Sequence, residues 1–214
     1  MSRFSRAFAA ISVPLLACSA FRTAGAQSTA TLIDPAHFRG ELAARALFEE
    51  SNRQRVAAGV PALAPLRAAE TAALWQAQFM AQTGTIGHVN TLDRNRRNLD
   101  DRVRAAGANF RYIAENVAMN FAIDYEPHRP FYTRPGPPGD VIYSYVPFGP
   151  PLPYHTYAGL ARTFVAQWLA SPAHRKNLLS PEAQYVGCAA VPGARDRSHG
   201  LGNIYCAQVF IATR

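Results

Sequence analysis

Four stretches of the chain carry apolar residues at intervals of three and four. This spacing places the apolar residues on one face of an α-helix, and it predicts helices over residues 37–58, 66–82 and 99–106. The fourth stretch has the clearest apolar face, and its helix is expected to end before Ser171, which caps a further short helical turn. The residues of that fourth face are Ala161, Phe164, Val165, Trp168 and Leu169.

Strand-forming segments lie between and after these helices. Residues 115–123 predict one strand. Residues 185–191 and 203–212 predict a hairpin, because both are rich in β-branched and aromatic residues and the segment between them contains proline and glycines. Helices and strands together indicate a mixed α+β fold.

Residues 125–154 differ from the rest of the chain because they contain nine prolines with aromatic residues between them. Proline interrupts both helices and strands, so we expect a long surface loop without regular elements. Aromatic side chains on a constrained loop can form the lip of a binding site, whereas packing over the domain is the alternative. The candidate loop residues are Tyr132, Tyr143, Tyr145, Phe148 and Tyr154.

The N-terminus has the pattern of an export signal. Arg3 and Arg6 occur without an acid, and the uncharged run 7–21 follows, as in the charged and apolar regions of a secretory signal. This run of about 15 residues is shorter than the roughly 20 that a membrane-spanning helix needs. Small residues then favour cleavage after Ala26, which predicts a signal peptide over residues 1–26.

A second route of export fits the same segment. Leu15 to Cys18 reads Leu-Leu-Ala-Cys and resembles the lipobox of bacterial lipoproteins, in which the cysteine is acylated. Residues 1–17 would then be removed, and Cys18 would attach the chain to a membrane. Both routes remain open: the protein is expected to be secreted, periplasmic or extracellular, or anchored to the envelope by lipid, without a transmembrane helix in the mature chain.

Composition and charge fit one globular domain over residues 27–214. Apolar types make up 49% and charged types 17% of the 214 residues, which is enough for one sizeable core. Three leader arginines contribute to the formal charge of +8, so +5 remains after cleavage. The densest basic cluster, residues 94–97, is flanked by Asp93 and Asp100. Nucleic-acid binding is therefore not expected, since it favours a concentrated basic stripe.

Two cysteines, Cys188 and Cys206, remain beyond the leader. In an oxidising compartment such a pair predicts a disulfide. If the two residues lie directly opposite each other in the hairpin, Val191 pairs with Asn203 and residues 192–202 form the connecting loop. The alternative is two free, buried thiols.

Several motifs occur in a characteristic order: Gly87-His88, then Glu115-Asn116-Val117-Ala118, then residues 171–179, Ser-Pro-Ala-His-Arg-Lys-Asn-Leu-Leu, and finally the segments around the two cysteines. In this order they resemble the bacterial branch of the CAP superfamily (the SCP domain) across essentially the whole mature chain. The resemblance implies an α-β-α sandwich, in which helices flank a small antiparallel sheet.

The same resemblance implies a cleft in which His88, Glu115 and His174 hold zinc or another divalent metal. Imidazole and carboxylate suit such an ion, although 27 and 59 residues separate the three positions. The alternative is a hydrogen-bonded polar cluster without metal. Many relatives carry a second glutamate where this chain has Ser171, which leaves three of the four usual site residues.

Two functions follow from these features. A Gly-x-Ser-x-Gly motif and glycine-rich phosphate loops are absent from the sequence. We therefore expect a non-catalytic binding module that engages a small apolar ligand, an envelope component or a protein. The alternative is a metal-dependent peptidase or esterase, with His88 and His174 on zinc and Glu115 as the general base.

Overall fold

A four-stranded sheet forms the middle layer of the protein. The computed structural model describes residues 28–137, 141–193 and 202–214, so the predicted leader and its Cys18 lie outside the described residues. The strand order is β1-β5-β6-β2, with β1 parallel to β5 and the other pairs antiparallel. The strands are β1 (Ala64–Pro65), β2 (Tyr112–Phe121), β5 (Tyr185–Pro192) and β6 (Asn203–Ala212).

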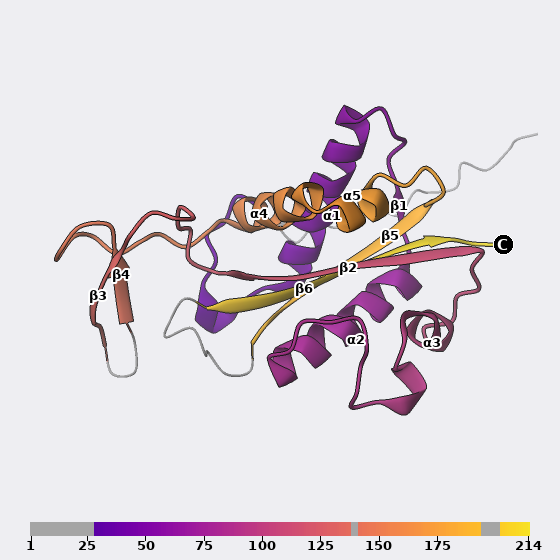
Figure 1. Cartoon of the computed structure of the whole chain (residues 1–214), viewed down its shortest axis with the longest axis horizontal. Coiled ribbons are helices and arrows are strands. Elements are labelled where there is room, and N and C mark those ends of the chain that lie inside the picture. The colour runs from indigo at the N-terminus through magenta and orange to yellow at the C-terminus, as the bar shows by residue number, and fades with distance from the viewer. Residues whose placement is uncertain (1–27, 138–140, 194–201) are drawn as a thin grey trace, which may run out of the picture.

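Helices cover both faces of this sheet (Figure 1). Three of them, α1, α4 and α5, pack on one face, and α2 with α3 packs on the other. This arrangement is the expected α-β-α sandwich. The helices are α1 (Gly40–Ala57), α2 (Arg67–Thr83), α3 (Leu99–Ala105), α4 (Tyr157–Ala170) and α5 (Pro172–Leu178), with short 3-10 turns at Pro35–His37 and Arg94–Arg96.

The two faces of the sheet support two hydrophobic clusters. Strand β6 has all ten of its residues buried, because helices cover both of its faces and strands flank both of its edges. Trp168 of α4, fully buried, belongs to the cluster on the α1 side. On the opposite face, α2 approaches β5 so closely that a Cβ on Gly187 would lie 2.0 Å from the Glu70 backbone nitrogen. The small residues along α2 permit this close packing.

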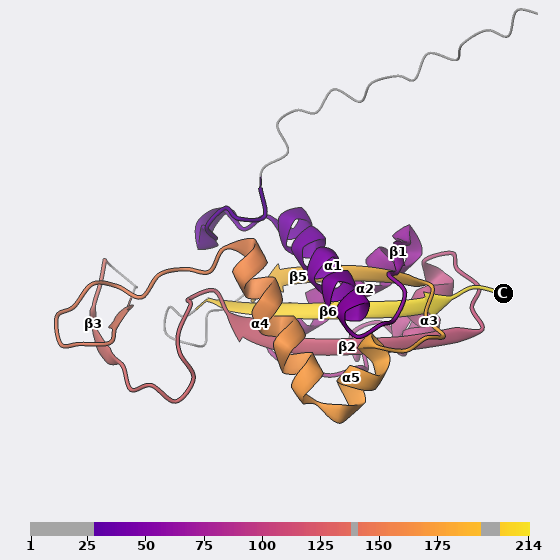
Figure 2. The same ribbon diagram turned by 90° about the horizontal axis from the view of Figure 1, so that it is seen from above.

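The proline-rich segment contains regular structure, so the prediction of a loop without strands is wrong. Strands β3 (Tyr132–Pro135) and β4 (Val141–Ser144) pair antiparallel. They form because the prolines lie at the strand ends and beyond them, which leaves short proline-free runs. Both views show this hairpin standing off from the sandwich as an arm (Figures 1 and 2), and we call residues 125–154 the arm below.

The C-terminal hairpin forms as predicted, but its register differs by two residues. Cys188 lies opposite Gln208, Cys206 lies opposite Ala190, and Val191 pairs with Tyr205 rather than with Asn203. The two cysteines are therefore diagonal neighbours on one face of the sheet. Both are buried, free thiols, so the predicted disulfide is not present in the structure.

Candidate functional site

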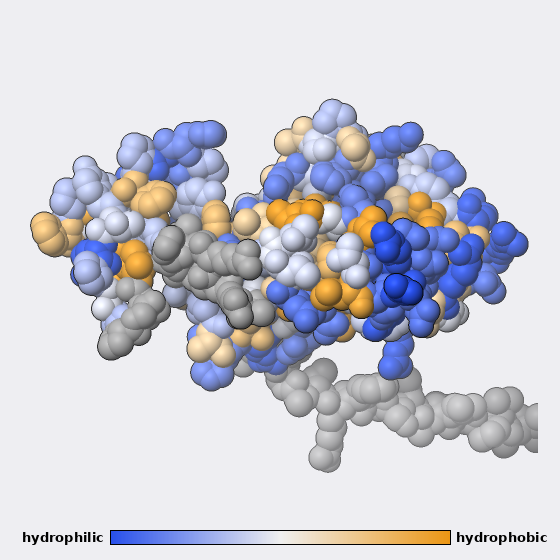
Figure 3. Space-filling view, turned by 60° about the horizontal axis from the view of Figure 1, so that its bottom comes forward, coloured by the Kyte–Doolittle hydropathy of each residue, from blue (hydrophilic) through white to orange (hydrophobic). Residues whose placement is uncertain are grey.

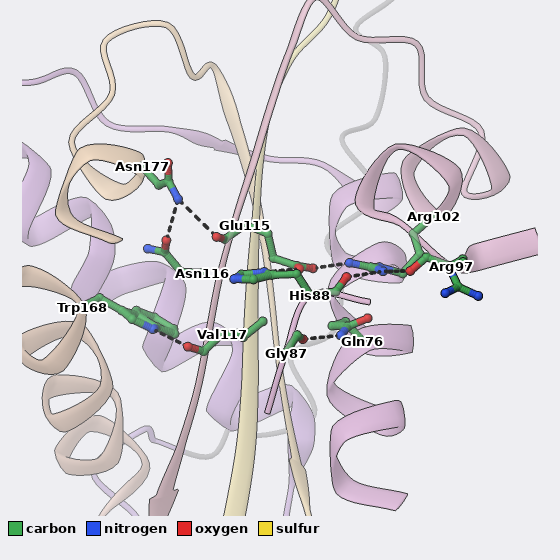
Figure 4. Close-up of polar contacts among 10 residues, drawn as sticks. All are labelled: Gln76, Gly87, His88, Arg97, Arg102, Glu115, Asn116, Val117, Trp168 and Asn177. Atoms are coloured by element: carbon green, nitrogen blue, oxygen red, sulfur yellow. Dashed lines mark hydrogen bonds and ion pairs between the residues drawn. The ribbon is translucent and has the colours of Figure 1, made fainter. Parts of the chain in front are cut away.

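The candidate site is built around Glu115, in the middle of the edge strand β2. Successive side chains of a strand point to opposite faces, so Glu115 faces the layer of α2 and α3 while Asn116 faces the layer of α4 and α5. The side chain of Glu115 is 2% exposed. Two successive residues of β2 therefore contact the helical layers on the two opposite faces of the sheet (Figure 4).

Both carboxylate oxygens of Glu115 are engaged. Arg102 of α3 donates from Nη2 to Oε1 at 2.7 Å, and His88 lies with Nδ1 2.9 Å from Oε2. The side chain of Arg102 is fully buried, whereas that of His88 is 53% exposed. The buried negative charge is thus balanced by a buried guanidinium, and the carboxylate fixes the orientation of an imidazole at the surface.

Arg102 also holds the loop that carries His88. Its Nη1 donates to the carbonyl oxygens of His88 at 3.2 Å and Arg97 at 3.1 Å. Gln76 of α2 donates to the carbonyl oxygen of Gly87, the residue before His88. The position of His88 is therefore set by two buried side chains from two different helices (Figure 4).

On the other side of β2, amide side chains attach α5. Asn116 donates to the carbonyl oxygen of His174 at 3.1 Å. Asn177 donates to the backbone oxygen of Glu115 at 3.2 Å and to the side-chain oxygen of Asn116 at 3.0 Å. His174 is consequently held beside the strand that carries Glu115.

His174 is affected by its burial and by its neighbour His88. Burial lowers the pKa of His174 below its usual value, and the charge that His88 can carry lowers it further. Both effects favour the neutral imidazole, which is the form that binds a metal ion. The structure therefore places His88 against Glu115, and it places His174 on the neighbouring helix α5, whose backbone accepts a hydrogen bond from Asn116, the next residue of the strand.

The hydrogen bonds of Glu115 make it a poor candidate for a direct metal ligand. Among the residues that the structure describes, no three His, Cys, Asp or Glu side chains are grouped to hold a metal ion. Glu115 already accepts hydrogen bonds at both oxygens. With Nδ1 of His88 directed at this carboxylate, Nε2 is the nitrogen left for a metal. A carboxylate that orients a ligating imidazole in this way is a common supporting group around zinc.

Arg102, the residue that organises this site, is not among the site residues predicted from the sequence. A signal was present, because Leu99, Arg102, Val103 and Ala106 follow the spacing of one helical face. An arginine on an otherwise apolar face indicates a buried charge that needs a partner.

The five aromatic candidates of the arm divide into two groups. Tyr143 is buried in the arm's own cluster, and Tyr145 stacks under Arg129, whose guanidinium carbon lies 3.8 Å from the ring centroid. Tyr132, Tyr154 and Phe148 are exposed, and Phe148 is 90% accessible. The space-filling view shows hydrophobic groups on the surface of the arm (Figure 3). A binding lip would therefore consist of the second group only.

Phe148 has an unusual backbone conformation as well as an exposed ring. Its φ of 55° lies in the left-handed region, which bulky residues rarely adopt. Such strain is found at sites where the surrounding structure holds a side chain for function.

Comparisons with known proteins agree with the sequence resemblance. The model of the cysteine-rich secretory protein family, CAP, matches residues 48–210. None of the curated proteins compared with the chain matches it. Among the residues described here, no helix is both long and apolar enough to cross a membrane.

Two solved structures share the fold. One is an extracellular protein of Bacillus anthracis that contains an SCP domain, with a TM-score of 0.51 and 19% identity over 81% of this chain and 41% of the Bacillus chain. The other is an outer surface protein of Borrelia burgdorferi, with a TM-score of 0.51 and 15% identity over 79% of this chain and 92% of the Borrelia chain. The matched region is thus less than half of the Bacillus protein, and at these identities the similarity concerns the fold alone.

Proposed function

Because the chain belongs to the cysteine-rich secretory protein family, CAP, we propose that it is an exported, non-catalytic binding module. Its surface site holds a divalent transition metal such as zinc through His88 and His174. Glu115 orients His88, and the exposed aromatic residues of the arm contact the partner, which is a small apolar molecule, an envelope component or a protein. The leader over residues 1–26 directs the export.

The observation that carries this proposal is the double engagement of Glu115. A general base must accept a proton from a water molecule within hydrogen-bond reach. One oxygen of Glu115 accepts from a permanently charged guanidinium and the other from His88, and the carboxylate is buried. Metal binding without hydrolysis would leave both hydrogen bonds of Glu115 in place, whereas hydrolysis would require Glu115 to give up one of these partners.

The metal would supply a Lewis-acidic centre that binds an electron-rich group of the partner. The residues of this chain would supply its position. Arg102 and Gln76 fix the loop of His88, Asn116 and Asn177 fix α5 beside β2, and the buried carboxylate selects the tautomer of His88.

Metal content tests the proposal directly. Protein purified without a histidine tag and loaded with zinc should retain about one zinc per chain by mass spectrometry, the number that one site implies. The His88→Ala, His174→Ala double variant should lose it. A matched control is the His37→Ala, His128→Ala double variant, which removes two histidines that lie outside the site.

Glu115→Gln separates an orienting residue from a ligand or a base. An orienting role predicts retained zinc with an affinity lowered about 10- to 100-fold. Complete loss of zinc in a folded Glu115→Gln variant would make Glu115 a ligand. Turnover of peptides or esters by the zinc-loaded protein, lost in the same variant, would favour the hydrolase.

A further inference from the structure

The sheet has an open edge at β5. Strand β1 pairs with Tyr185 and Val186 only, and among the described residues no other strand lies on the outer side of β5. A groove of about 620 Å³ lies at this edge, with Cys188, Ala189 and Ala190 at its floor. Phe48 of α1 and Leu74 of α2 contribute to its two walls. In the view from above, only the short β1 is labelled beyond β5 on this side of the sheet (Figure 2).

The hydrogen-bond register shows which backbone groups of β5 face this groove. Gly193 donates to the carbonyl oxygen of Asn203, so the odd-numbered residues of β5 form the hydrogen-bonded pairs with β6. The backbone groups of the even-numbered residues therefore point away from β6. Gln184, which precedes β5, follows this direction with its carbonyl oxygen, which accepts from Ala64 of β1, but its N–H donates to Ile211 of β6.

Cys188 and Ala190 are even-numbered residues of β5 that lie past the segment paired with β1. By this rule each directs one N–H and one carbonyl oxygen toward the groove, where no strand among the described residues pairs with them. Buried backbone groups normally have partners, and an edge strand with free N–H and C=O groups is a template for another strand.

We infer that this groove receives an extended peptide segment of a partner protein, which adds a strand to the outer edge of β5. Its backbone would pair with Cys188 and Ala190, and its side chains would lie alternately against α1 and α2. The inference is independent of the metal site, which lies at the opposite edge strand, β2.

The chemistry of the groove favours a peptide over an acyl chain. An acyl chain would fill the apolar walls but would leave the four polar groups of Cys188 and Ala190 unpaired and further from water, which is unfavourable. A strand satisfies them at the regular spacing that β1 already uses two residues earlier.

The walls also restrict the side chains of such a peptide. A Cβ on Gly40 would lie 3.4 Å from the carbonyl oxygen of Ala190, so the approach to this oxygen is narrow. The rim carries one acid and one arginine on each helix, namely Glu41 and Arg45 of α1 and Arg67 and Glu70 of α2. Since these charges balance, the expected segment is uncharged and has small apolar side chains.

Amide exchange measured by NMR tests the inference. The probe is the peptide acetyl-Ser-Val-Ala-Val-Ala-Ser-amide, added to the chain from residue 27 onward, without its leader. We expect amide shifts along β5 and hydrogen exchange of the Cys188 and Ala190 N–H groups slowed by about tenfold or more. The matched probe is the same peptide with N-methyl groups at alternate residues, which cannot pair as a strand and should have no effect.

Variants on the two walls complete the test. Ala44→Trp fills the groove from α1, and Leu74→Arg places a charge on its rim, so each should abolish the peptide effect. Val56→Arg, on an exposed part of α1 outside the groove, should not. A well-dispersed spectrum identifies the folded variants.

Three outcomes would overturn the inference. Equal effects of the plain and N-methylated peptides would show that side chains alone are recognised. Protection of Cys188 and Ala190 by sodium dodecanoate instead of the peptide would make the groove a lipid site. Protection that appears without peptide at higher protein concentration would make a second copy of this chain the occupant.

Discussion

At the scale of single residues, Arg102 is the side chain on which the candidate site depends. It is fully buried, and it joins α3, the loop of His88 and strand β2 through hydrogen bonds to a carboxylate and two carbonyl oxygens. Its loss would leave the carboxylate of Glu115 buried without its cationic partner.

We therefore predict that Arg102→Met lowers the free energy of unfolding by about 3–5 kcal/mol, the usual effect of breaking a buried ion pair. Urea unfolding measures it. Arg104→Met is the control, because Arg104 forms an exposed pair with Asp100 and should change stability little. The Arg102→Met, Glu115→Gln double variant should recover part of the lost stability. Equal effects of Arg102→Met and its control Arg104→Met would contradict the prediction.

The cysteines give a second prediction. Burial raises the pKa of Cys188 to about 12 and raises that of Cys206 as well, so both thiols are protonated and unreactive at neutral pH. N-ethylmaleimide should label neither residue in the native protein and both after denaturation without a reductant. A peptide that contains Cys188 linked to Cys206 in the mass spectrum would show that the disulfide forms after all.

His155 gives a third prediction, on pH. It is buried beneath Gly159, with Asp124 3.5 Å from its Nδ1. Burial lowers its pKa, Asp124 opposes this effect, and Arg162 adds to it. The unfolded chain therefore binds this proton more readily than the folded chain, so stability is lost as the pH falls through about 6.5, the ordinary value.

His155→Gln should consequently lose less stability than the wild type between pH 7.5 and pH 5. Thermal unfolding at a series of pH values measures the difference, and the comparison of two proteins at each pH removes the contribution of other groups. Parallel curves for the two proteins would exclude His155 as the cause.

At the scale of secondary structure, the hydrophobic pattern predicted the helices well and the strand register poorly. The four helical stretches appear within a few residues of their expected ends, because each buries one face. The hairpin register could not be fixed in this way. A slip of two residues keeps every side chain on the same face, so the alternation is equally satisfied with Cys188 opposite Cys206 or opposite Gln208.

The approach of α2 to β5 gives a fourth prediction. Because a Cβ on Gly187 would lie 2.0 Å from the nitrogen of Glu70 and 2.1 Å from the carbonyl carbon of Ala69, Gly187→Ala must displace the start of α2. We expect it to lower the free energy of unfolding by about 1–3 kcal/mol or more. Gly87→Ala, with open space around the new methyl group, is the control, and equal stability of both variants would refute the close packing.

At the scale of the whole molecule, the arm is separate from the sandwich. Its residues Tyr143 and Leu152 form a small cluster with Ile123, which lies just before the arm, and Ile123 also forms a bridge with Tyr154 at the other end of the arm. We predict that replacing residues 126–151 by Gly-Ser-Gly-Ser leaves a cooperatively folded domain whose melting temperature changes by less than about 4 °C, the effect of roughly 1 kcal/mol. Loss of a cooperative transition would mean that the arm supports the core.

The candidate site also depends on how the whole molecule folds. His88, Glu115 and His174 come from a loop, a strand and a helix, and no local spacing connects them. Only their order within a family resemblance predicted a shared site, and the structure shows the contact between His88 and Glu115. The role of Arg102 requires knowledge of how α3 packs on β2, which the sequence does not provide.

Strand β6 occupies the centre of the sheet although it is the last element along the chain. Its neighbours β2 and β5 pair with it and not with each other, so the sheet cannot assemble until residue 212 has left the ribosome. Domains usually fold as units during synthesis, and here every other strand and helix of the domain must emerge before its central strand does. The nascent chain therefore stays unfolded for longer than one whose strands pair in the order of synthesis. An unfolded chain is also the form that the proposed leader would direct to translocation.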